Sequence, residues 1–190
     1  FLRLAALYHD AGKASTFSLD ETGRIHFYDH QKRSVEAVLR LSERVRLSNK
    51  ASDYLRRTVG YHMDIGFALS DQASPRTLRK MISRMGDELV DIILMSTADR
   101  IATRGPLTTQ EGLEIYMDFC GDLLREYYRE KETAPLIGGK DLMDELFLPE
   151  GPLIGEVLQE IRMAQLEGAV KTREEALGFA RDLIRSRNNE

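Results

Sequence analysis

The sequence predicts an all-α protein, and two observations lead to that prediction. Apolar residues recur every three or four positions along most of the 190 residues, the spacing of helices with one buried face. Helix-start signals precede several of these stretches, and Gly or Pro follows them. The composition, 42% hydrophobic and 31% charged, is typical of a globular protein and not of a disordered chain. Charges interrupt every apolar run before the ~18 residues of a membrane span, so no membrane partner is expected.

The first half of the chain predicts several helices and one extended segment. A helix starts at about Leu2 and ends near His9, and an apolar stripe marks another across 30–47. A Ser-Pro pair opens a helix over 74–85, because Ser is a good N-cap and Pro suits the first helical position. Residues 86–102 are apolar nearly all round, which indicates a buried central helix. A small hairpin is expected within 16–28.

The second half predicts three more helices. Thr108 with Glu111 has the spacing of a capping box, so a long helix is expected from there to about residue 130. A further helix is expected over 152–167, and a second capping box, Thr172 with Glu175, opens the last one. Between residue 131 and Pro152, glycines and prolines predict a loop-rich connection.

These elements predict a main helical bundle over 1–131 and a helical extension over 132–190. Phe1 lies directly in a helical pattern with neither an initiator Met nor a signal peptide, which indicates a piece of a longer chain. The single Cys120 excludes an internal disulfide framework and a Cys-rich zinc site. It suits a reducing compartment, so a cytoplasmic location is expected.

Charge is distributed unevenly along a chain whose formal net charge is −4. Residues 24–57 hold nine basic and four acidic residues, whereas residues 87–160 hold six basic and 17 acidic ones. A basic face beside an acidic body attracts a polyanion locally. The plainer interpretation, that these cations are the solvated sides of amphipathic helices, stays open.

The sequence His9-Asp10-Ala11-Gly12-Lys13 is the first candidate for chemistry. Adjacent helical residues point ~100° apart, so His9 and Asp10 face one ion only near a helix end, which Gly12 is expected to supply as a left-handed cap. An imidazole and a carboxylate suit a divalent ion such as Mn, Fe, Ni, Zn or Mg. Lys13 is expected to hold a phosphate as a compact positive charge.

Three further residues are candidate ligands for the same ion. His30 opens a predicted helix, His62 closes one, and Asp99 lies near the end of the apolar helix. A buried acid is costly unless it is paired or bound to a metal, so Asp99 indicates a polar cluster in the core. The plainer interpretations make His30 and His62 caps or surface residues and pair Asp99 with Arg100 or Arg104.

Together, the His-Asp pentapeptide, the two later histidines and Ala98-Asp99-Arg100 resemble the HD superfamily of metal-dependent phosphohydrolases. The chain is more narrowly similar to the C-terminal half of bacterial tRNA nucleotidyltransferases and poly(A) polymerases that carry an HD domain. That closer resemblance depends on the tail, which includes Gly139-Lys140-Asp141-Leu142, Pro149-Glu150-Gly151-Pro152 and Thr172-Arg173-Glu174-Glu175-Ala176. Glu150 is a small departure, because the family has Pro directly followed by Gly there.

The resemblance implies an HD-domain bundle followed by an RNA-holding tail. It implies that a divalent ion is held by His9, Asp10, His30, His62 and Asp99, with Lys13 as the catalytic lysine. It also implies that phosphates of a tRNA, or of another RNA 3′ end, are contacted by Arg33, Arg40, Arg44, Arg57, Arg79 and Lys80.

Two features of the family do not match this chain. The polymerase head has a Gly-Ser signature and paired aspartates, so this chain alone is not expected to add nucleotides and would depend on such an N-terminal head. HD sites also include another His on a preceding helix, and none comes before His9. The site is therefore expected to be one ligand short or completed by a water.

Three interpretations stay open. The first is the RNA-positioning part of a tRNA nucleotidyltransferase or poly(A) polymerase. The second is a phosphohydrolase acting on 2′,3′-cyclic phosphates, 2′-nucleotides or simple phosphomonoesters at the HD site. The third is an HD scaffold without catalysis.

Overall fold

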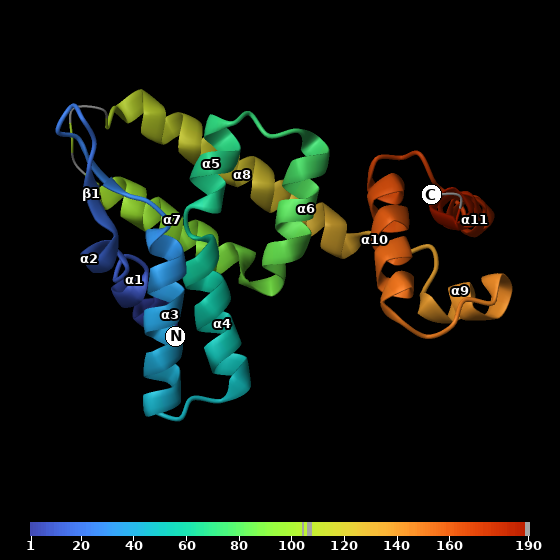
Figure 1. Cartoon of the computed structure of the whole chain (residues 1–190). Helices are drawn as coiled ribbons and strands as arrows, with labels where there is room; N and C mark the ends of the chain where they lie inside the picture. The colour runs from blue at the N-terminus through green and yellow to red at the C-terminus, as the bar shows by residue number, and fades with distance from the viewer. Residues whose placement is uncertain (104, 106–107, 189–190) are drawn as a thin grey trace. The chain divides into compact units, whose positions relative to one another are not determined.

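The computed structural model describes residues 1–103, 105 and 108–188, and it confirms the all-α fold class (Figure 1). The chain divides into two compact units, Phe1–Arg125 and Glu126–Glu190, which are described separately below. This boundary lies inside a long helix, slightly before the division that the sequence predicted after residue 131. No helix among the described residues is long and apolar enough to cross a membrane.

The first unit contains a row of helices and one hairpin. Its elements are α1 (Leu2–Tyr8), α2 (Lys13–Thr16), β1 (Phe17–Leu19), β2 (Ile25–Phe27), α3 (His30–Arg44), α4 (Asn49–Tyr61), α5 (Asp64–Ser70), α6 (Pro75–Met85), α7 (Leu89–Ala102) and most of α8 (Gln110–Glu132). Helix α4 ends where the sequence placed His62, and α5 follows it as a short helix that the sequence pattern did not show.

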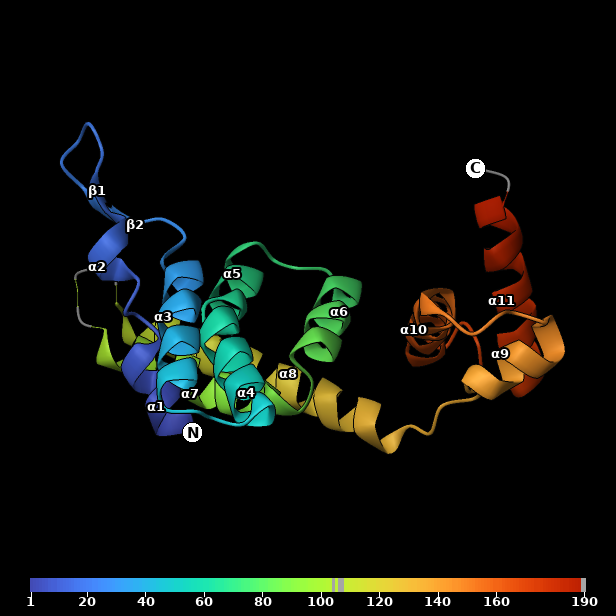
Figure 2. The same ribbon diagram turned by 60° about the horizontal axis from the view of Figure 1, so that its bottom comes forward.

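Helices α3 and α4 lie side by side in both ribbon views and pack on α1 and α7 (Figures 1 and 2). Val38, Leu55 and Val59 are fully buried between them, together with Ala5 from α1. Met95 from α7 completes this cluster. Because side chains on one helical stripe face the same neighbour, this packing brings the end of α1, the start of α3 and the end of α4 together.

Gly12 corrects one expectation about how the first helix ends. Its φ of −67° is right-handed, so the chain does not turn there through a left-handed cap. Instead, a Cβ atom on residue 12 would lie 2.1 Å from the His30 carbonyl oxygen and 2.7 Å from the Ser34 amide nitrogen. Glycine is required because the backbone lies against the first turn of α3, where the Ser34 hydroxyl accepts a 2.9 Å hydrogen bond from the Gly12 amide.

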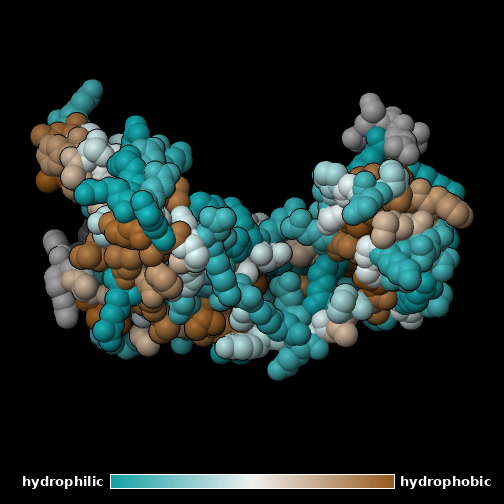
Figure 3. All heavy atoms as spheres, turned by 90° about the horizontal axis from the view of Figure 1, so that it is seen from below, coloured by the Kyte–Doolittle hydropathy of each residue, from teal (hydrophilic) through white to brown (hydrophobic). Residues whose placement is uncertain are grey.

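The hairpin lies within the segment 16–28, with Phe17 opposite Phe27 and Leu19 opposite Ile25 in an antiparallel register. Asp20 accepts hydrogen bonds from the Thr22 and Arg24 amides and so holds the turn. More than half of the Phe17, Leu19 and Ile25 surfaces is exposed. Figure 3 shows this apolar surface in brown at the upper left of the view.

Helix starts follow the sequence signals with one correction. The Ser74 hydroxyl accepts a hydrogen bond from the Thr77 amide at 3.2 Å, which confirms the predicted cap of α6. The capping residue of α8 is Thr109 instead of Thr108, since the Thr109 hydroxyl accepts from the Gly112 amide at 3.0 Å. The central helix begins as a short 3₁₀ turn at Gly86–Glu88 before α7.

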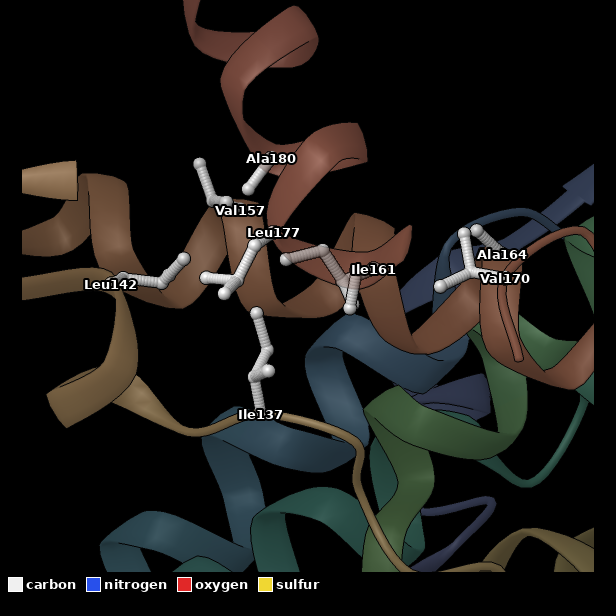
Figure 4. Packing of buried hydrophobic residues seen from close by; sticks show 9 residues of the cluster. Ile137, Leu142, Val157, Ile161, Ala164, Val170, Leu177 and Ala180 are labelled. Atoms are coloured by element: carbon white, nitrogen blue, oxygen red, sulfur yellow. The ribbon is translucent and has the colours of Figure 1, made fainter. Parts of the chain in front are cut away.

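The second unit packs the end of α8 with α9 (Gly139–Leu146), α10 (Pro152–Leu166) and α11 (Arg173–Asn188). Its core comes from all three later helices, with Leu142, Val157 and Ala180 completely buried (Figure 4). Helix α9 lies where the sequence predicted a loop-rich connection, and the Asp141 carboxylate caps its start by accepting from the Gly138 amide at 2.8 Å. The Thr172–Glu175 box is confirmed, because each side chain accepts from the other residue's amide.

Candidate metal centre

Three histidines from different elements face one point in the first unit. His9 follows the last turn of α1, His30 opens α3 and His62 follows the last turn of α4. The ring centroids of His9 and His62 are 5.1 Å apart, and those of His30 and His62 are 5.6 Å apart. The helix ends that the core packing brings together therefore carry the imidazoles.

The backbone holds each imidazole in the same way. The Nδ1 atom of each ring lies close to a backbone carbonyl oxygen. The distance is 2.7 Å from His9 to Ala6, 2.8 Å from His30 to Phe27 and 2.7 Å from His62 to Val59. A carbonyl only accepts, so each Nδ1 carries the proton and donates. An imidazole held in this way can offer Nε2 to a metal ion once that nitrogen carries no proton, which is the arrangement of metal-binding histidines.

The Nε2 atoms point at two carboxylates. Asp10 Oδ2 lies 3.3 Å from His9 Nε2, and Asp10 Oδ1 lies 3.2 Å from His30 Nε2 and 3.9 Å from His62 Nε2. Asp99 Oδ1 on α7 lies 3.4 Å from His9 Nε2. The Nε2 atoms of His9 and His30 are buried, yet no described group is placed to form a hydrogen bond with either.

These distances suit a divalent ion. One ligand atom each from His9, Asp10 and His62 lies within 4.8 Å of the other two. Ions of this kind bind nitrogen and oxygen at ~2.0–2.2 Å, so opposite ligands lie a little over 4 Å apart. Buried lone pairs without a hydrogen-bond donor are what such an ion satisfies. The described residues therefore fit a nitrogen- and oxygen-ligated cation.

Electrostatics couple His9 to its neighbour. The Asp10 carboxylate raises the pKa of His9 to about 9, against the opposing effect of burial. Burial acts to raise the pKa of Asp10, but the His9 and Lys13 cations outweigh it and hold that pKa well below its usual range. Burial lowers the pKa of His62, which keeps this imidazole neutral.

Asp99 differs from the expectation of an acid in the core. Its side chain is 41% exposed, so it lies at the edge of the cluster instead of within hydrocarbon. The neighbouring Arg100 does not form an ion pair with Asp99. Its guanidinium lies over the Tyr116 ring instead, 4.7 Å from the ring centre. Arg104, the other partner considered, lies outside the described residues.

Lys13 lies beside the cluster on α2. Its Nζ atom is 2.5 Å from Asp10 Oδ2 and 5.7 Å from the centre of the Phe27 ring. The ammonium is therefore adjacent to any anion bound at the cluster, although its nearest partner here is a protein carboxylate. The sequence pattern predicted neither the hydrogen bond of Ser34 to Gly12 nor the close approach of Gly12 to α3. The only signal in the sequence was that both residues are small.

The basic residues expected to contact RNA fall into three groups. Arg33, Arg40 and Arg44 are exposed residues on α3. They lie on one face of the helix, because Arg40 follows Arg33 by about two turns and Arg44 follows Arg40 by about one. Arg33 and Arg40 share Glu36 as a partner, at 3.0 Å and 4.0 Å. Arg79 and Lys80 lie on α6.

Arg57 is held inside the first unit. It donates to Glu88 at 2.9 Å and to the carbonyls of Arg84 and Met85 at 2.7 Å each. Its side chain is only 22% exposed. Arg57 therefore joins α4 to the junction of α6 and α7, and its positive charge is paired with Glu88 inside the first unit.

Comparisons with known proteins identify relatives over nearly the whole chain. Residues 129–180 match the family described as "tRNA nucleotidyltransferase domain 2 putative". The chain is 34% identical over 181 residues to a CC-adding tRNA nucleotidyltransferase of Thermus thermophilus, a match covering 93% of this chain and 38% of the relative. It is 32% identical over 180 residues to an A-adding tRNA nucleotidyltransferase of Deinococcus radiodurans, covering 94% of this chain and 40% of the relative.

A shorter match covers part of the chain. A CC-adding tRNA nucleotidyltransferase of a Synechocystis species is 41% identical over 75 residues, which is 37% of this chain and 18% of the relative. The chain thus spans about two fifths of the length of the first two relatives, which have the longer matches.

Proposed function

We propose that this chain, a relative of the tRNA nucleotidyltransferases over almost its whole length, is the part of such an enzyme that holds the tRNA. Nucleotide addition at the tRNA 3′ end would be carried out by residues outside the chain. The observation that carries this proposal is the sequence similarity to two tRNA nucleotidyltransferases. The alignments with them cover 93% and 94% of the chain. The alternative parent is a poly(A) polymerase. A cytoplasmic location belongs to the same proposal.

The arginine face of α3 supports a role in binding phosphates. Arg33, Arg40 and Arg44 present their charges in one row along the exposed side of a helix. Exposed ion pairs such as those with Glu36 contribute little, ~0–1 kcal/mol, so an RNA phosphate can replace the carboxylate. Interactions of this kind fix the position of the RNA and do not read its bases.

Binding of tRNA as a function of salt tests the proposal. Replacing Arg33, Arg40 and Arg44 together by Gln should lower the slope of log K against log salt by ~0.7–0.9 for each phosphate that the protein no longer neutralises. Arg56→Gln is the matched control, because Arg56 pairs with Asp53 at 2.6 Å on α4 and lies off this face. No affinity of the chain for tRNA at low salt would contradict the proposal, and preference for a poly(A) tract over tRNA would favour the alternative parent.

A second function is favoured by the convergence of three histidine Nε2 atoms on Asp10. We infer an HD-type phosphohydrolase centre in which His9, Asp10, His30, His62 and Asp99 hold a divalent ion. Such an ion lowers the pKa of bound water and polarises a phosphoryl oxygen. Lys13 would neutralise a phosphate oxygen next to Asp10, and the three backbone carbonyls would keep the imidazoles oriented.

The reaction would be the hydrolysis of a phosphate ester. The oxygen of water bonds to phosphorus, the bond from phosphorus to the ester oxygen breaks, and the leaving alkoxide takes up a proton. A monoester yields an alcohol and inorganic phosphate, and a 2′,3′-cyclic phosphate yields a monoester. The residues in the centre bind and orient the phosphate for this displacement.

Activity assays with added Mn, Ni or Mg test the centre. His9→Ala and Asp10→Ala should each lower turnover of a 2′,3′-cyclic phosphate or a 2′-nucleotide by at least ~100-fold, and chelation should do the same. His26→Ala is the matched control, since His26 pairs with Asp20 in the exposed hairpin. Equal activity in all variants would remove the hydrolase proposal. Tight metal binding without any hydrolysis would leave the scaffold interpretation.

A further inference from the structure

A cavity of about 370 Å³ lies in the first unit, next to the His/Asp cluster. Its size falls in the range of small-molecule sites, ~300–1,000 Å³. Its walls come from α5, α7 and the first turns of α8, and His62 and Asp99 are among its lining residues. Two side chains of the cluster therefore form part of the cavity wall.

The rest of the wall includes apolar and aromatic residues together with Ser, Thr and Tyr residues. Met63, Phe67 and Leu113 line the cavity, and Tyr116 lies in the wall with its hydroxyl 2.5 Å from that of Ser96. Aromatic rings and a thioether are surfaces on which a planar ring packs well. Thr109 also lines the cavity.

Arg100 supplies positive charge to this wall. Among the described residues that line the cavity it is the one Lys or Arg, and no described carboxylate pairs with it. Its guanidinium lies over the Tyr116 ring at 4.7 Å, which keeps the side chain on the cavity wall. A guanidinium without a carboxylate is suited to bind a phosphate oxygen.

Gly66 on α5 leaves space in the cavity. A Cβ atom added to Gly66 would meet nothing within 4 Å, although Gly66 is a lining residue. Because Gly66 lines the cavity, we expect a larger side chain at position 66 to occupy part of it. The absence of a side chain here keeps the space open for a ligand.

We propose that this cavity binds the nucleoside of a ribonucleotide whose phosphate lies between the His62–Asp99 end and Arg100. The base packs against Phe67, Met63 and Leu113, and the ribose lies near the hydroxyl groups. The cavity thus makes the centre selective for nucleotides over small phosphate esters. This inference rests on the proposed hydrolase centre for its catalytic readout, but binding of the nucleotide is a separate property.

The test compares two substrates in the Mn-loaded full chain, adenosine 2′-monophosphate and p-nitrophenyl phosphate. Gly66→Leu should lower the ratio of kcat/KM for the nucleotide to kcat/KM for the small ester by at least about tenfold, because the leucine fills the nucleoside space. Gly155→Leu is the matched control, since Gly155 is also a helical glycine with nothing within 4 Å of an added Cβ and lies in the second unit. An unchanged ratio in a folded Gly66→Leu protein that still binds Mn would overturn the proposal.

Arg100→Gln is a second variant for the case in which Gly66→Leu fails to fold. Arg100 is exposed, so its loss should leave the fold intact while raising KM for the nucleotide by about tenfold. An unchanged KM would count against the assigned phosphate position and overturn the proposal.

Direct binding separates failure of this inference from failure of the hydrolase proposal. If the wild-type chain hydrolyses neither substrate, the hydrolase proposal fails, and calorimetry with adenosine 2′-monophosphate decides the cavity. Binding that Gly66→Leu weakens at least about tenfold supports the nucleoside site, and no binding by the wild type overturns it. Hydrolysis of both substrates with no preference for the nucleotide would overturn the proposal of a nucleoside-binding cavity, whereas the proposal of a hydrolase centre would stand.

Discussion

Gly12 lies against the first turn of α3, and no larger residue fits there. Gly12→Ala would place a Cβ atom 2.1 Å from the His30 carbonyl oxygen, so α2 and α3 must separate. We expect a loss of stability on the order of 3 kcal/mol, together with weaker metal binding because His30 moves. Urea unfolding followed by circular dichroism measures the first effect.

The control for Gly12 is Gly178→Ala in α11, where an added Cβ meets nothing within 4 Å. This substitution should be neutral or stabilise by up to ~1 kcal/mol, since Ala has the higher helix propensity. Equal stability of the Gly12→Ala protein and the wild type would show that the close approach is absent in solution.

Metal uptake should release a proton from His9. Because Asp10 raises the pKa of His9 to about 9, this imidazole carries a proton at pH 7.5 in the metal-free protein, whereas Asp10 is ionised and His62 neutral. A metal must displace that proton, so apparent affinity should rise about tenfold per pH unit and level off above about 9. Calorimetry of Mn binding in buffers of different ionisation enthalpy should show about one proton released.

The raised pKa of His9 should also make the stability of the metal-free protein depend on pH. A pKa raised above its unfolded value stabilises the fold fully below about 6.5, and that contribution disappears as the pH rises through about 9. His26→Gln is the control, because His26 lies in the exposed hairpin and should not alter the proton count. Zero proton release at pH 7.5 would contradict the assigned protonation of His9.

At the scale of elements, Arg57 joins α4 to the junction of α6 and α7. Arg57→Ala removes hydrogen bonds to Glu88 and to two backbone carbonyls, and it leaves these acceptors partly buried. We expect a loss of about 2 kcal/mol, since hydrogen bonds to charged groups contribute ~1.5–3 kcal/mol. Thermal and urea unfolding measure it.

Arg40→Ala is the comparison for Arg57. Arg40 lies 4.0 Å from Glu36 with 68% of its side chain exposed, so its removal should change stability by less than ~0.5 kcal/mol while weakening tRNA binding. If Arg57→Ala left stability unchanged and weakened tRNA binding instead, Arg57 would have the RNA role that the sequence suggested.

The helices could be predicted from sequence where a cap or an apolar stripe marked them. Ser74-Pro75 and Thr172 with Glu175 behave as their chemistry predicts. Helix α9 was missed because Gly138 and Gly139 favour a turn by propensity, whereas burial of Leu142 and capping by Asp141 stabilise a helix there. Thr108 and Thr109 carry the same side chain, so spacing alone did not identify the capping residue.

The residues of the candidate centre could be named from sequence, but their arrangement could not. His9, Asp10, His30, His62 and Asp99 were candidates because of their residue types and their places at helix ends. That all three imidazoles direct Nδ1 at a backbone carbonyl, and that the cavity adjoins them, depends on how α1, α3, α4 and α7 pack. Long-range packing leaves no local signal in a single sequence.

At the scale of the whole molecule, the two units should respond separately to a core substitution. Leu142→Ala empties a fully buried position in the second unit and should destabilise that unit by ~2–5 kcal/mol. Mn binding at the first unit should be retained, because the five candidate ligands all come before residue 125. Amide hydrogen exchange should show faster exchange in α9, α10 and α11 and little change in α3 and α4.

The control is Leu55→Ala, which empties the core of the first unit. It should give the reverse pattern, with faster exchange in α3 and α4 and weaker Mn binding. Faster exchange throughout the chain in both variants would show that the molecule unfolds as one cooperative body.

The three carbonyls behind the imidazoles have a consequence for how the centre fails. Each acceptor, at Ala6, Phe27 or Val59, belongs to the last residues of a helix or strand. Fraying at any one of these ends would let one ring rotate and withdraw its lone pair, even while the hydrocarbon interior stays intact. Ion retention would therefore report early loosening of the backbone, before global melting begins.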